Sequence, residues 1–336
     1  MSLFRRNVLP DRQEAAIQKT VSHLRAQRRN RFRILACIDG TDESFISVRK
    51  AARFGASDEC DIIILYVRPI DTGLHSGGLQ VRLARQNMME SGFELPGVSH
   101  LKRALDILKA EGLDVSDWSR EVQNQDAWGD PAGDNKIEYK GPTGRSVVLK
   151  LKTAPDVAVG ILDQYELGPY NLIIVGAPSR WRSEFRSLFD SGVVQTIATM
   201  APCSVMVARK QNERMGFLFA IDGTARSMQL VRRGAVLAHV MQRDISLLSV
   251  APDEAARPAA QEAVANAQAL LKAMGITTLE ARVAVGDVAT SIVEVGNNYG
   301  TIVVNDERRT KMERLLRGSV ATEVVRRAAT SVLEVR

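Results

Sequence analysis

The sequence predicts two tandem α/β domains, each built on a five-stranded parallel sheet with helices on both faces. The first observation is an internal repeat, because residues 35–69 match residues 218–252 at 14 of 35 positions. The second is the order of patterns in each copy: an apolar run, the turn Asp-Gly-Thr, a helical periodicity and another apolar run. Strand, turn, helix and strand in this order are the unit of a parallel sheet.

Composition places the chain among ordinary globular proteins. Its 336 residues have room for two cores, and hydrophobic residues make up 45% and charged residues 25%. No apolar run reaches the roughly 18 residues of a membrane span, and the N-terminus lacks a signal-peptide apolar region. The three cysteines follow no metal or redox spacing, so we expect them to be buried in the protein core, and we expect the protein to reside in a reducing compartment. We therefore expect a cytoplasmic protein.

A basic arm, residues 1–30, precedes the repeats. Residues 1–33 hold nine Lys and Arg against two acidic residues, a net charge of +7, which leaves −1 for the remainder. The spacing of Ile17, Val21 and Leu24 predicts a helix over about 11–29 with a narrow apolar stripe. Two interpretations stay open: the arm binds an anionic membrane surface, a nucleic acid or an acidic protein partner, or it packs its apolar stripe on its own domain.

The first domain is expected over residues 31–210. Continuous apolar runs, as in buried parallel strands, predict strands at 32–38, 61–67, 146–152, 171–175 and 204–208. Apolar residues at helical spacing predict helices at 43–56, 100–110, 156–165 and 192–200. Residues 114–147 are an insertion without a counterpart in the second copy. Within it, Lys136–Lys140 and Ser146–Lys152 predict a β-hairpin around Gly141-Pro142-Thr143-Gly144.

The second domain is expected over residues 214–336 and follows the same order. Its strands are predicted at 216–221, 244–250, 280–285, 301–304 and 331–335. Its helices are predicted at 226–240, 257–274, 287–298 and 318–328. The ends of the two copies also match, with Ala201, Ser204, Val205 and Arg209 corresponding to Ala328, Ser331, Val332 and Arg336.

A further motif lies in the last third of each copy. The first copy reads Gly176-Ala177-Pro178-Ser179, eleven residues, Ser191-Gly192, and then Ala201-Pro202-Cys203-Ser204-Val205. The second reads Asn305-Asp306-Glu307-Arg308, nine residues, and Gly318-Ser319-Val320. With these features the chain resembles the universal stress protein family over about residues 31–336, in two tandem copies. ATP-binding members carry G-x2-G-x9-G-(S/T) after the fourth strand.

The resemblance implies a Rossmann-like fold of the adenine nucleotide α-hydrolase type. It also implies that the domains pair as family dimers do, edge strand 204–208 against edge strand 331–335. In the motif, glycines let the backbone approach phosphate oxygens, and the Gly-Ser pair opens a helix whose free N–H groups favour an anion. The pocket lies beyond the carboxyl ends of the strands.

Candidate nucleotide-binding residues follow from the resemblance by position. In the second domain they are Asp222, Val250, Asn305, Arg308, Gly318 and Ser319. In the first they are Asp39, Val67, Gly176, Ser179, Ser191 and Gly192. The aspartates end the first strands and the valines end the second strands. In members of the family, residues at these positions face the adenosine of the bound nucleotide. Each Asp-Gly-Thr is also a good strand-to-helix turn, and this structural role is compatible with the binding role.

Both copies depart from the motif, the first more than the second. The second keeps Gly318-Ser319 at the family spacing, and Arg308 in place of a glycine either meets a phosphate or fills the pocket. The first has a loop two residues longer that bears Trp181 and Phe185, and its Ser191-Gly192 pair is inverted. The second domain is therefore predicted to be the better pocket.

The leading functional hypothesis is a stress-response regulator that binds ATP, ADP or AMP, with Mg²⁺ accompanying ATP. No catalytic or metal-ligating constellation is evident, so turnover is expected to be slow ATP hydrolysis at most. The alternative is a scaffold without nucleotide, which docks to a partner complex or a membrane surface through the arm and the insertion.

Enzymatic chemistry of the ATP-pyrophosphatase type at Ser76-Gly77-Gly78-Leu79 is disfavoured, because in that enzyme class the loop follows the first strand, whereas here it follows the second. Asp130 and Asp134 are more simply a hairpin tip than a cation site. Homodimerisation stays open.

Overall fold

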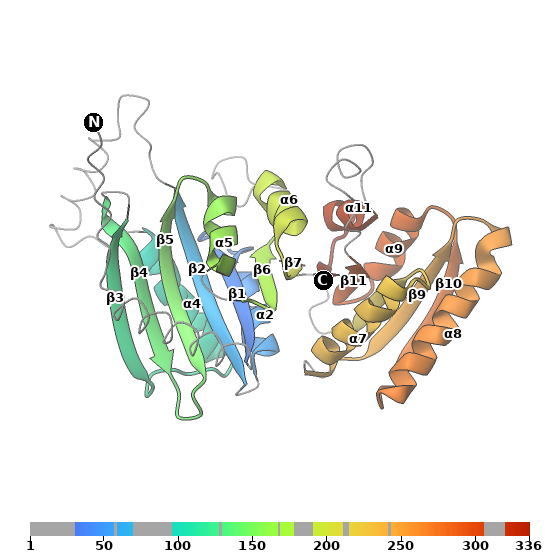
Figure 1. Cartoon of the computed structure of the whole chain (residues 1–336), viewed down its shortest axis with the longest axis horizontal. Coiled ribbons are helices and arrows are strands. Elements are labelled where there is room, and N and C mark those ends of the chain that lie inside the picture. Colours follow the sequence, from blue (N-terminus) through green and yellow to red (C-terminus); the bar gives the residue numbers. More distant parts are fainter. Residues whose placement is uncertain are drawn as a thin grey trace, which may run out of the picture.

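All strands of the described chain belong to one sheet. The computed structural model describes residues 31–56, 59–69, 96–127, 130–166, 169–177, 191–210, 215–240, 243–305 and 320–336. Within them, twelve strands follow the order β10-β9-β8-β11-β12-β7-β6-β1-β2-β5-β4-β3 (Figure 1). The basic arm and its predicted helix lie outside the described residues.

Domain 1 has the predicted parallel sheet, in the order β5-β2-β1-β6-β7. Its strands are β1 (Phe32–Ile38), β2 (Cys60–Pro69), β5 (Ser146–Ala154), β6 (Leu172–Gly176) and β7 (Ser204–Ala208). Its helices are α2 (Phe45–Phe54), α4 (Pro96–Ala110), α5 (Val157–Glu166) and α6 (Ser191–Met200). The bounds agree with the prediction to within two residues, except that α4 begins four residues earlier.

Domain 2 repeats this topology with the parallel order β10-β9-β8-β11-β12. Its strands are β8 (Phe217–Ile221), β9 (Ile245–Ala251), β10 (Thr278–Val285), β11 (Thr301–Asn305) and β12 (Ser331–Val335). Its helices are α7 (Ala225–Val240), α8 (Arg257–Ala273), α9 (Val288–Gly296) and α11 (Val320–Arg327), with a 3-10 turn η1 (Glu254–Ala256) before α8. The predicted tandem Rossmann-like fold is confirmed.

The insertion widens the sheet of domain 1 by two antiparallel strands, β3 (Ser119–Ala127) and β4 (Asp130–Lys140). The predicted β4–β5 hairpin is present, with Lys140 opposite Ser146. β3 was not predicted, because its polar sequence shows no alternation of apolar residues. β3 and β4 meet at Ala127 and Asp130, whereas Asp134 lies inside β4 and accepts a hydrogen bond from the Thr153 amide at 2.7 Å.

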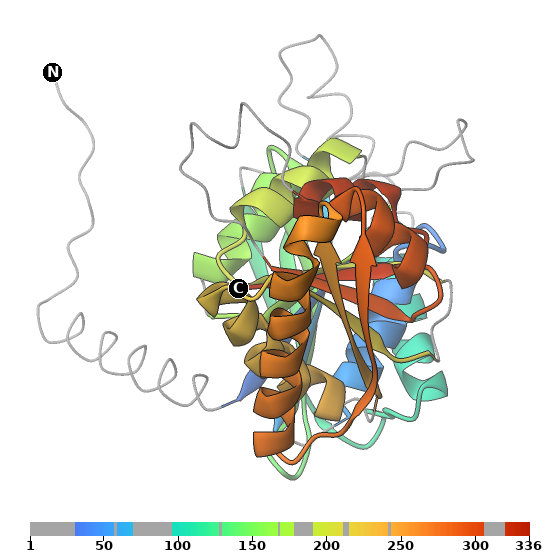
Figure 2. The same ribbon diagram turned by 90° about the vertical axis from the view of Figure 1, so that its right-hand side faces the viewer.

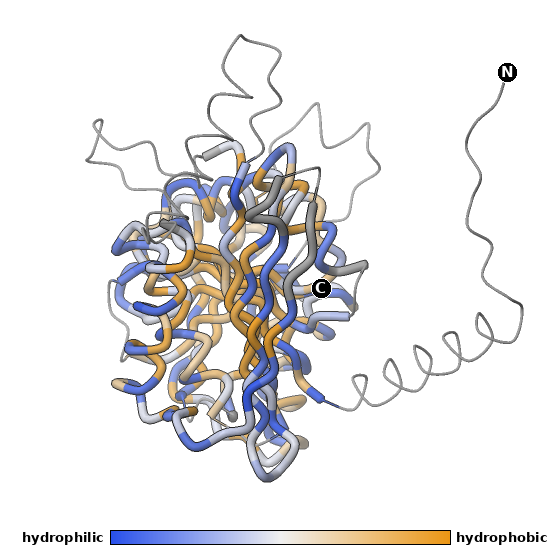
Figure 3. The backbone as a smooth tube through the Cα atoms, turned by 90° about the vertical axis from the view of Figure 1, so that its left-hand side faces the viewer, coloured by the Kyte–Doolittle hydropathy of each residue, from blue (hydrophilic) through white to orange (hydrophobic). Residues whose placement is uncertain are grey.

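Helices cover both faces of the sheet, as the view along the strand order shows (Figure 2). The largest buried cluster joins residues of α2, α4, α7 and α8 to one face. A second cluster places α5 and α6 on the other face of domain 1, and a third places α9 and α11 on the other face of domain 2. The hydropathy of the backbone tube accordingly turns from polar outside to apolar along the central strands (Figure 3).

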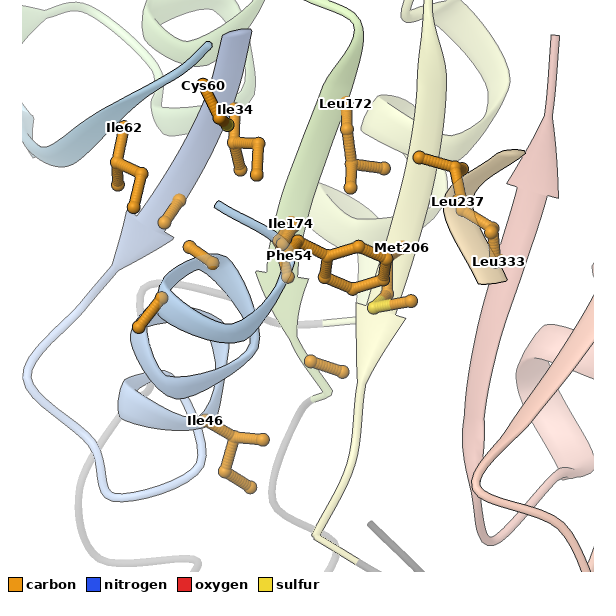
Figure 4. Packing of buried hydrophobic residues seen from close by; sticks show 14 of the residues in the cluster. Ile34, Ile46, Phe54, Cys60, Ile62, Leu172, Ile174, Met206, Leu237 and Leu333 are labelled. Atoms are coloured by element: carbon orange, nitrogen blue, oxygen red, sulfur yellow. The ribbon is translucent and has the colours of Figure 1, made fainter. Parts of the chain in front are cut away.

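The two domains meet at an antiparallel pair of edge strands, β7 and β12, as the family resemblance implied. Met206 lies opposite Leu333, and both side chains are fully buried. Across the same seam, the rings of Phe54 in α2 and Phe217 in β8 lie 6.5 Å apart. Figure 4 shows Phe54, Met206 and Leu333 within one packed layer that also receives Leu237 of α7. The domains therefore share one hydrophobic core.

Two corresponding arginines, one in each domain, make hydrogen bonds across the seam. Arg209, after β7, donates to the carbonyl oxygens of Val325 at 2.6 Å and Thr330 at 3.2 Å, at the end of α11. Arg336, after β12, donates to the carbonyl oxygens of Ala198, Ala201 and Cys203, at the end of α6. Each domain thus supplies the cation that satisfies the C-terminal carbonyls of a helix in the other.

Serines matched in the repeat complete this reciprocal arrangement. The Arg336 amide donates to Ser204 Oγ at 3.1 Å, and the Arg209 amide donates to Ser331 Oγ at 3.0 Å. The end-to-end match in the sequence is therefore explained, because these residues form the interface between the two copies.

The three cysteines are buried, as predicted from their spacing. Burial raises the pKa of Cys60 and of Cys203 to about 12, and it raises the pKa of Cys37 further. A thiol that stays protonated is a poor nucleophile and a poor metal ligand, so these cysteines serve packing.

We predict that Phe217→Ala destabilises both domains together. Truncation removes a fully buried ring from the seam, which typically costs about 3–5 kcal/mol of unfolding free energy. Urea unfolding followed by circular dichroism measures this loss. A matched control is Leu271→Ala, also fully buried but in α8 of domain 2 away from the seam. If Phe217→Ala left the stability within about 1 kcal/mol of wild type, the shared core would be contradicted.

Candidate functional site

The Asp-Gly-Thr turns lie directly after β1 and β8, where the parallel strands of each domain end. In domain 1, Asp39 Oδ1 accepts from the Thr41 amide at 3.0 Å and from Thr41 Oγ1 at 2.6 Å. In domain 2, Asp222 Oδ1 accepts from the Thr224 amide at 3.0 Å and from Thr224 Oγ1 at 2.7 Å. The two turns are therefore alike in their internal geometry.

A serine three residues later joins each turn to its helix. Thr41 Oγ1 accepts from the Ser44 amide at 3.2 Å, and Thr224 Oγ1 accepts from the Ser227 amide at 3.2 Å. Ser44 Oγ in turn accepts from the Asp39 amide at 3.1 Å. The glycine between Asp and Thr has a positive φ in both turns, +90° in domain 1 and +79° in domain 2, which explains the residue type.

The same turn is closed in domain 1 and open in domain 2. The side chain of Asp39 belongs to a residue only 9% exposed, whereas Asp222 is exposed. The imidazole of His100, in α4, covers Gly40 so closely that a Cβ there would collide with it. In domain 2 the nearest atom to the equivalent position on Gly223 is the methyl group of Ala263, at 3.0 Å. An aromatic side chain therefore shields one turn, and a methyl group borders the other.

His100 is held among aromatic and charged groups. Its ring centroid lies 5.6 Å from that of Tyr66 and 6.4 Å from that of Phe45. Arg103, one turn further along α4, lies 4.3 Å from the Phe45 ring centroid and pairs with Asp42 at 2.7 Å. Burial lowers the pKa of His100 below its ordinary 6.5, against the opposing effect of Asp39. A neutral imidazole therefore fills this corner at neutral pH.

Sequence reasoning missed this role of His100. The four histidines of the sequence are scattered and form no motif. Helical periodicity places His100 on α4, but it carries no information on which turn of the domain that helix covers. The pairing of an Asp-Gly-Thr turn with a downstream histidine was the only available signal.

Gly176, the one glycine kept from the start of the first motif, is used in packing. A Cβ on Gly176 would lie 2.6 Å from Ser44 Cα and 2.7 Å from the Glu43 carbonyl oxygen, both backbone atoms at the start of α2. In domain 2 the same strand end carries Asn305, whose side chain is half-buried. The two copies thus differ at this strand end, because domain 1 has a glycine against which the start of α2 packs and domain 2 has an asparagine.

The valines also differ in exposure. Val67 lies inside β2, which continues to Pro69, and its side chain is 3% exposed. It contacts Gly160 of α5, where a Cβ would lie 2.7 Å from Val67 Cγ1. Val250 lies in β9 opposite Ala284 of β10 and is half-buried. Only the second valine leaves apolar surface near the end of its strand.

Four candidates, Ser179, Arg308, Gly318 and Ser319, lie outside the described residues. Ser191 and Gly192 form the first two residues of α6, and Thr196 Oγ1 donates to the Gly192 carbonyl oxygen at 2.8 Å. α11 begins at Val320, the residue after Ser319. This start fits the prediction that Gly318-Ser319 opens a helix.

A polar cluster in domain 2 adds residues that the motif did not indicate. Asp287 caps α9 and accepts hydrogen bonds from the amide and the hydroxyl of Thr290, which lower the pKa of its carboxyl. Arg327 of α11 donates to Thr290 Oγ1 at 3.1 Å and lies 3.7 Å from a carboxylate oxygen of Glu323. This cluster ties α11 to α9, so it fixes the helix that follows Gly318-Ser319.

Comparison with known proteins places the chain in a family. The sequence model of the universal stress protein family matches residues 30–209 and 215–336. The chain therefore belongs to the universal stress protein family, with two family domains in tandem. None of the curated proteins compared with the chain matches it.

Two solved structures that superpose over most of this chain agree on the fold. A universal stress protein from Archaeoglobus fulgidus DSM 4304 superposes with a TM-score of 0.57 at 14% identity, over 90% of this chain and 96% of its own. A putative universal stress protein from Pseudomonas aeruginosa UCBPP-PA14 gives a TM-score of 0.55 at 12% identity, over 92% of this chain and 94% of its own. A universal stress protein in complex with cAMP is 27% identical over 36% of this chain and 97% of its own, with a TM-score of 0.33.

Two kinds of feature are absent from the described residues. They contain no cluster of three or more His, Cys, Asp or Glu side chains arranged to hold a metal ion. None of the helices in the described part combines the length and the hydropathy of a membrane span.

We predict that Gly176→Ala destabilises the protein and that Asn305→Ala does not. The added methyl group meets backbone that cannot rotate away, and such overpacking costs about 1–3 kcal/mol. Asn305 is half-buried at the corresponding strand end, so its truncation is expected to cost below about 0.5 kcal/mol. Urea unfolding of the two variants measures the difference. Equal stability of both would contradict the packing role of Gly176.

Proposed function

We propose that this universal stress protein binds one adenine nucleotide per chain, in domain 2, and acts as a nucleotide-dependent regulator in the stress response. The observation that carries the proposal is the unequal access to two otherwise equivalent turns. Asp222 is exposed and bordered by a methyl group, whereas Asp39 is buried beneath an imidazole. Family membership supplies the ligand class.

The residues of domain 2 suit such a ligand in chemistry. Asp222 Oδ1 is engaged by Thr224, and within the described residues Oδ2 has no hydrogen-bonding partner. Oδ2 is thus available to accept an N–H or O–H of a nucleoside. Val250, half-buried between β8 and β10, offers an apolar surface to a base. Asn305 adds an amide at the end of β11.

Phosphate binding is assigned by position to the segment before α11. Gly318 and Ser319 would present backbone N–H groups and a hydroxyl, and Arg308 would add a guanidinium. Mg²⁺ would accompany ATP through its phosphate oxygens. Neither the described candidates of domain 2 nor the candidates before α11 include two side chains that could act as base and nucleophile. We therefore propose that nucleotide binding changes the affinity of the protein for a partner and is not followed by turnover.

Domain 1 fits the nucleotide less well. Its Asp39 interacts electrostatically with His100, its Gly176 is packed on α2, and its Val67 is buried against α5. Each of these described candidates already serves the fold. We therefore assign domain 1 a structural role.

We predict that Asp222→Asn weakens nucleotide binding about tenfold or more, since a hydrogen bond to a charged acceptor is worth roughly 1.5–3 kcal/mol. Asparagine keeps an oxygen for the turn, so the fold is expected to persist. Asp39→Asn makes the same change in domain 1 and is the matched control, with binding expected to be unchanged. Titration calorimetry with ATP, ADP and AMP measures affinity and stoichiometry.

Three results would oppose the proposal. Two nucleotides per chain, or loss of binding in Asp39→Asn, would contradict the assignment to domain 2. No heat of binding and no nucleotide released on denaturation would favour the scaffold, in which the basic arm and the insertion carry the interaction with a partner.

A further inference from the structure

The sheet of the described chain ends in two outer strands of different composition, β3 and β10 (Figure 1). Seven of the nine residues of β3 are polar or charged, whereas five of the eight residues of β10 are apolar. After an irregularity at its start, β10 pairs residue by residue with β9 from Glu280 to Val285. A regular strand with apolar side chains invites association at its open edge, and a polar strand discourages it. Of the two edges, β10 is therefore the one suited to bind a further strand.

Domain 1 shows how the equivalent edge is covered. β5 holds the place in the strand order of domain 1 that β10 holds in domain 2. β4 of the insertion pairs antiparallel with β5 over six residue pairs, from Asn135 opposite Leu151 to Lys140 opposite Ser146. The second copy has no counterpart of this insertion, so within the described residues β10 has a strand on one side alone. An antiparallel strand is thus the element that this edge of the fold accepts.

We propose that β10 of a second copy of the chain supplies this strand, antiparallel about a two-fold axis at Ala281. In this register, Glu280 of each copy lies opposite Arg282 of the other. Leu279 of each copy lies opposite Val283 of the other. Moving the axis by one residue places Glu280 opposite itself or Arg282 opposite itself, and like charges directly opposite destabilise a sheet. The charges of β10 therefore select both the partner and the register.

The side chains of β10 leave surface for this contact. The carboxylate of Glu280 pairs with Arg282 of its own strand and accepts a hydrogen bond from Tyr299 Oη at 2.7 Å. The side chains of Glu280 and Arg282 nevertheless stay 39% and 53% exposed. Leu279 is 69% exposed, more than any other large hydrophobic residue in the described part of the chain. Pairing of the two strands would give each carboxylate a second arginine and would remove apolar surface from water.

A single pair of strands is a small interface, and small interfaces bind weakly. We expect a Kd for dimerisation on the order of 10 μM. Below that concentration β10 is a free edge, and above it the sheets of two copies are continuous.

Sedimentation equilibrium of the full-length protein over a range of concentrations measures this association without nucleotide. Glu280→Arg and Arg282→Glu each place like charges opposite one another at two symmetric positions. Each is expected to raise the dimerisation Kd about tenfold or more. In an equimolar mixture of the two variants, every Arg lies opposite a Glu when one chain of each kind pairs. The mixture is therefore expected to dimerise as wild type does, while either variant alone does not.

Cross-linking tests the position of the axis and needs neither charge reversal. Residue 281 is opposite its own copy, where Cα atoms of an antiparallel pair lie about 4.5–5.5 Å apart, within the range of a disulfide. Ala281→Cys is therefore expected to form an intermolecular disulfide under mild oxidation. The matched control is Val283→Cys, also half-buried in β10, which lies opposite Leu279 and is expected to stay uncrosslinked. The three native cysteines are buried, so they do not compete.

Three outcomes would overturn the inference. They are a wild-type protein that stays monomeric about tenfold above the expected Kd, a dimer that neither charge reversal weakens, and equal cross-linking of the two cysteine variants. Circular dichroism checks that each variant is folded, and the cross-linking result decides if a charge reversal does not fold. All these measurements are made without nucleotide, so the proposed function stands or falls separately.

Discussion

The structure depends on the pairing of two sheet edges. A parallel α/β sheet ends in a strand whose outer N–H and C=O groups lack partners, and such an edge invites association. In this chain the edge β7 pairs with the edge β12, so the last strand of each domain is buried by the other. The arginine that follows each of these strands then makes hydrogen bonds to the other domain, one of them to the serine in the partner strand. Because the α-helices of the described residues pack on this continuous sheet, the seam fixes how the two halves are placed.

The two copies share the same fold and the same Asp-Gly-Thr turn, but the turn is more exposed in domain 2 than in domain 1. The hydrogen bonds that the aspartate carboxylate accepts agree between the two Asp-Gly-Thr turns to within about 0.1 Å. What differs is the helix that follows the second strand: α4 presents His100, and α8 presents Ala263. The retained turn is explained by its role at the start of a helix, which both domains need. Binding would depend on what covers the turn, and only domain 2 leaves its aspartate exposed.

Sequence predicted the repeating elements well, because buried parallel strands are continuous apolar runs and the repeat allowed each to be checked twice. β3 escaped, since an outermost strand can be polar on both faces and carries no periodic signal. The pairing of the edge strands was predicted from the family resemblance, whereas the reciprocal arginine caps could be seen only in the structure. Gly176 shows the limit of a motif: the residue fits a phosphate loop by position, yet close backbone packing explains it. Arg308, Gly318, Ser319 and Ser179 remain predictions from the motif.

The most direct measurement of the central claim is amide hydrogen exchange along the sheet of the full-length protein. If β7 and β12 form an internal seam, their amides will exchange as slowly as those of β1 and β8, which lie between two neighbours in the sheet order. The outermost strands β3 and β10 provide the reference for a true edge. Exchange of β7 and β12 at the rate of β3 and β10 would show that the domains do not share a sheet, and would contradict the account.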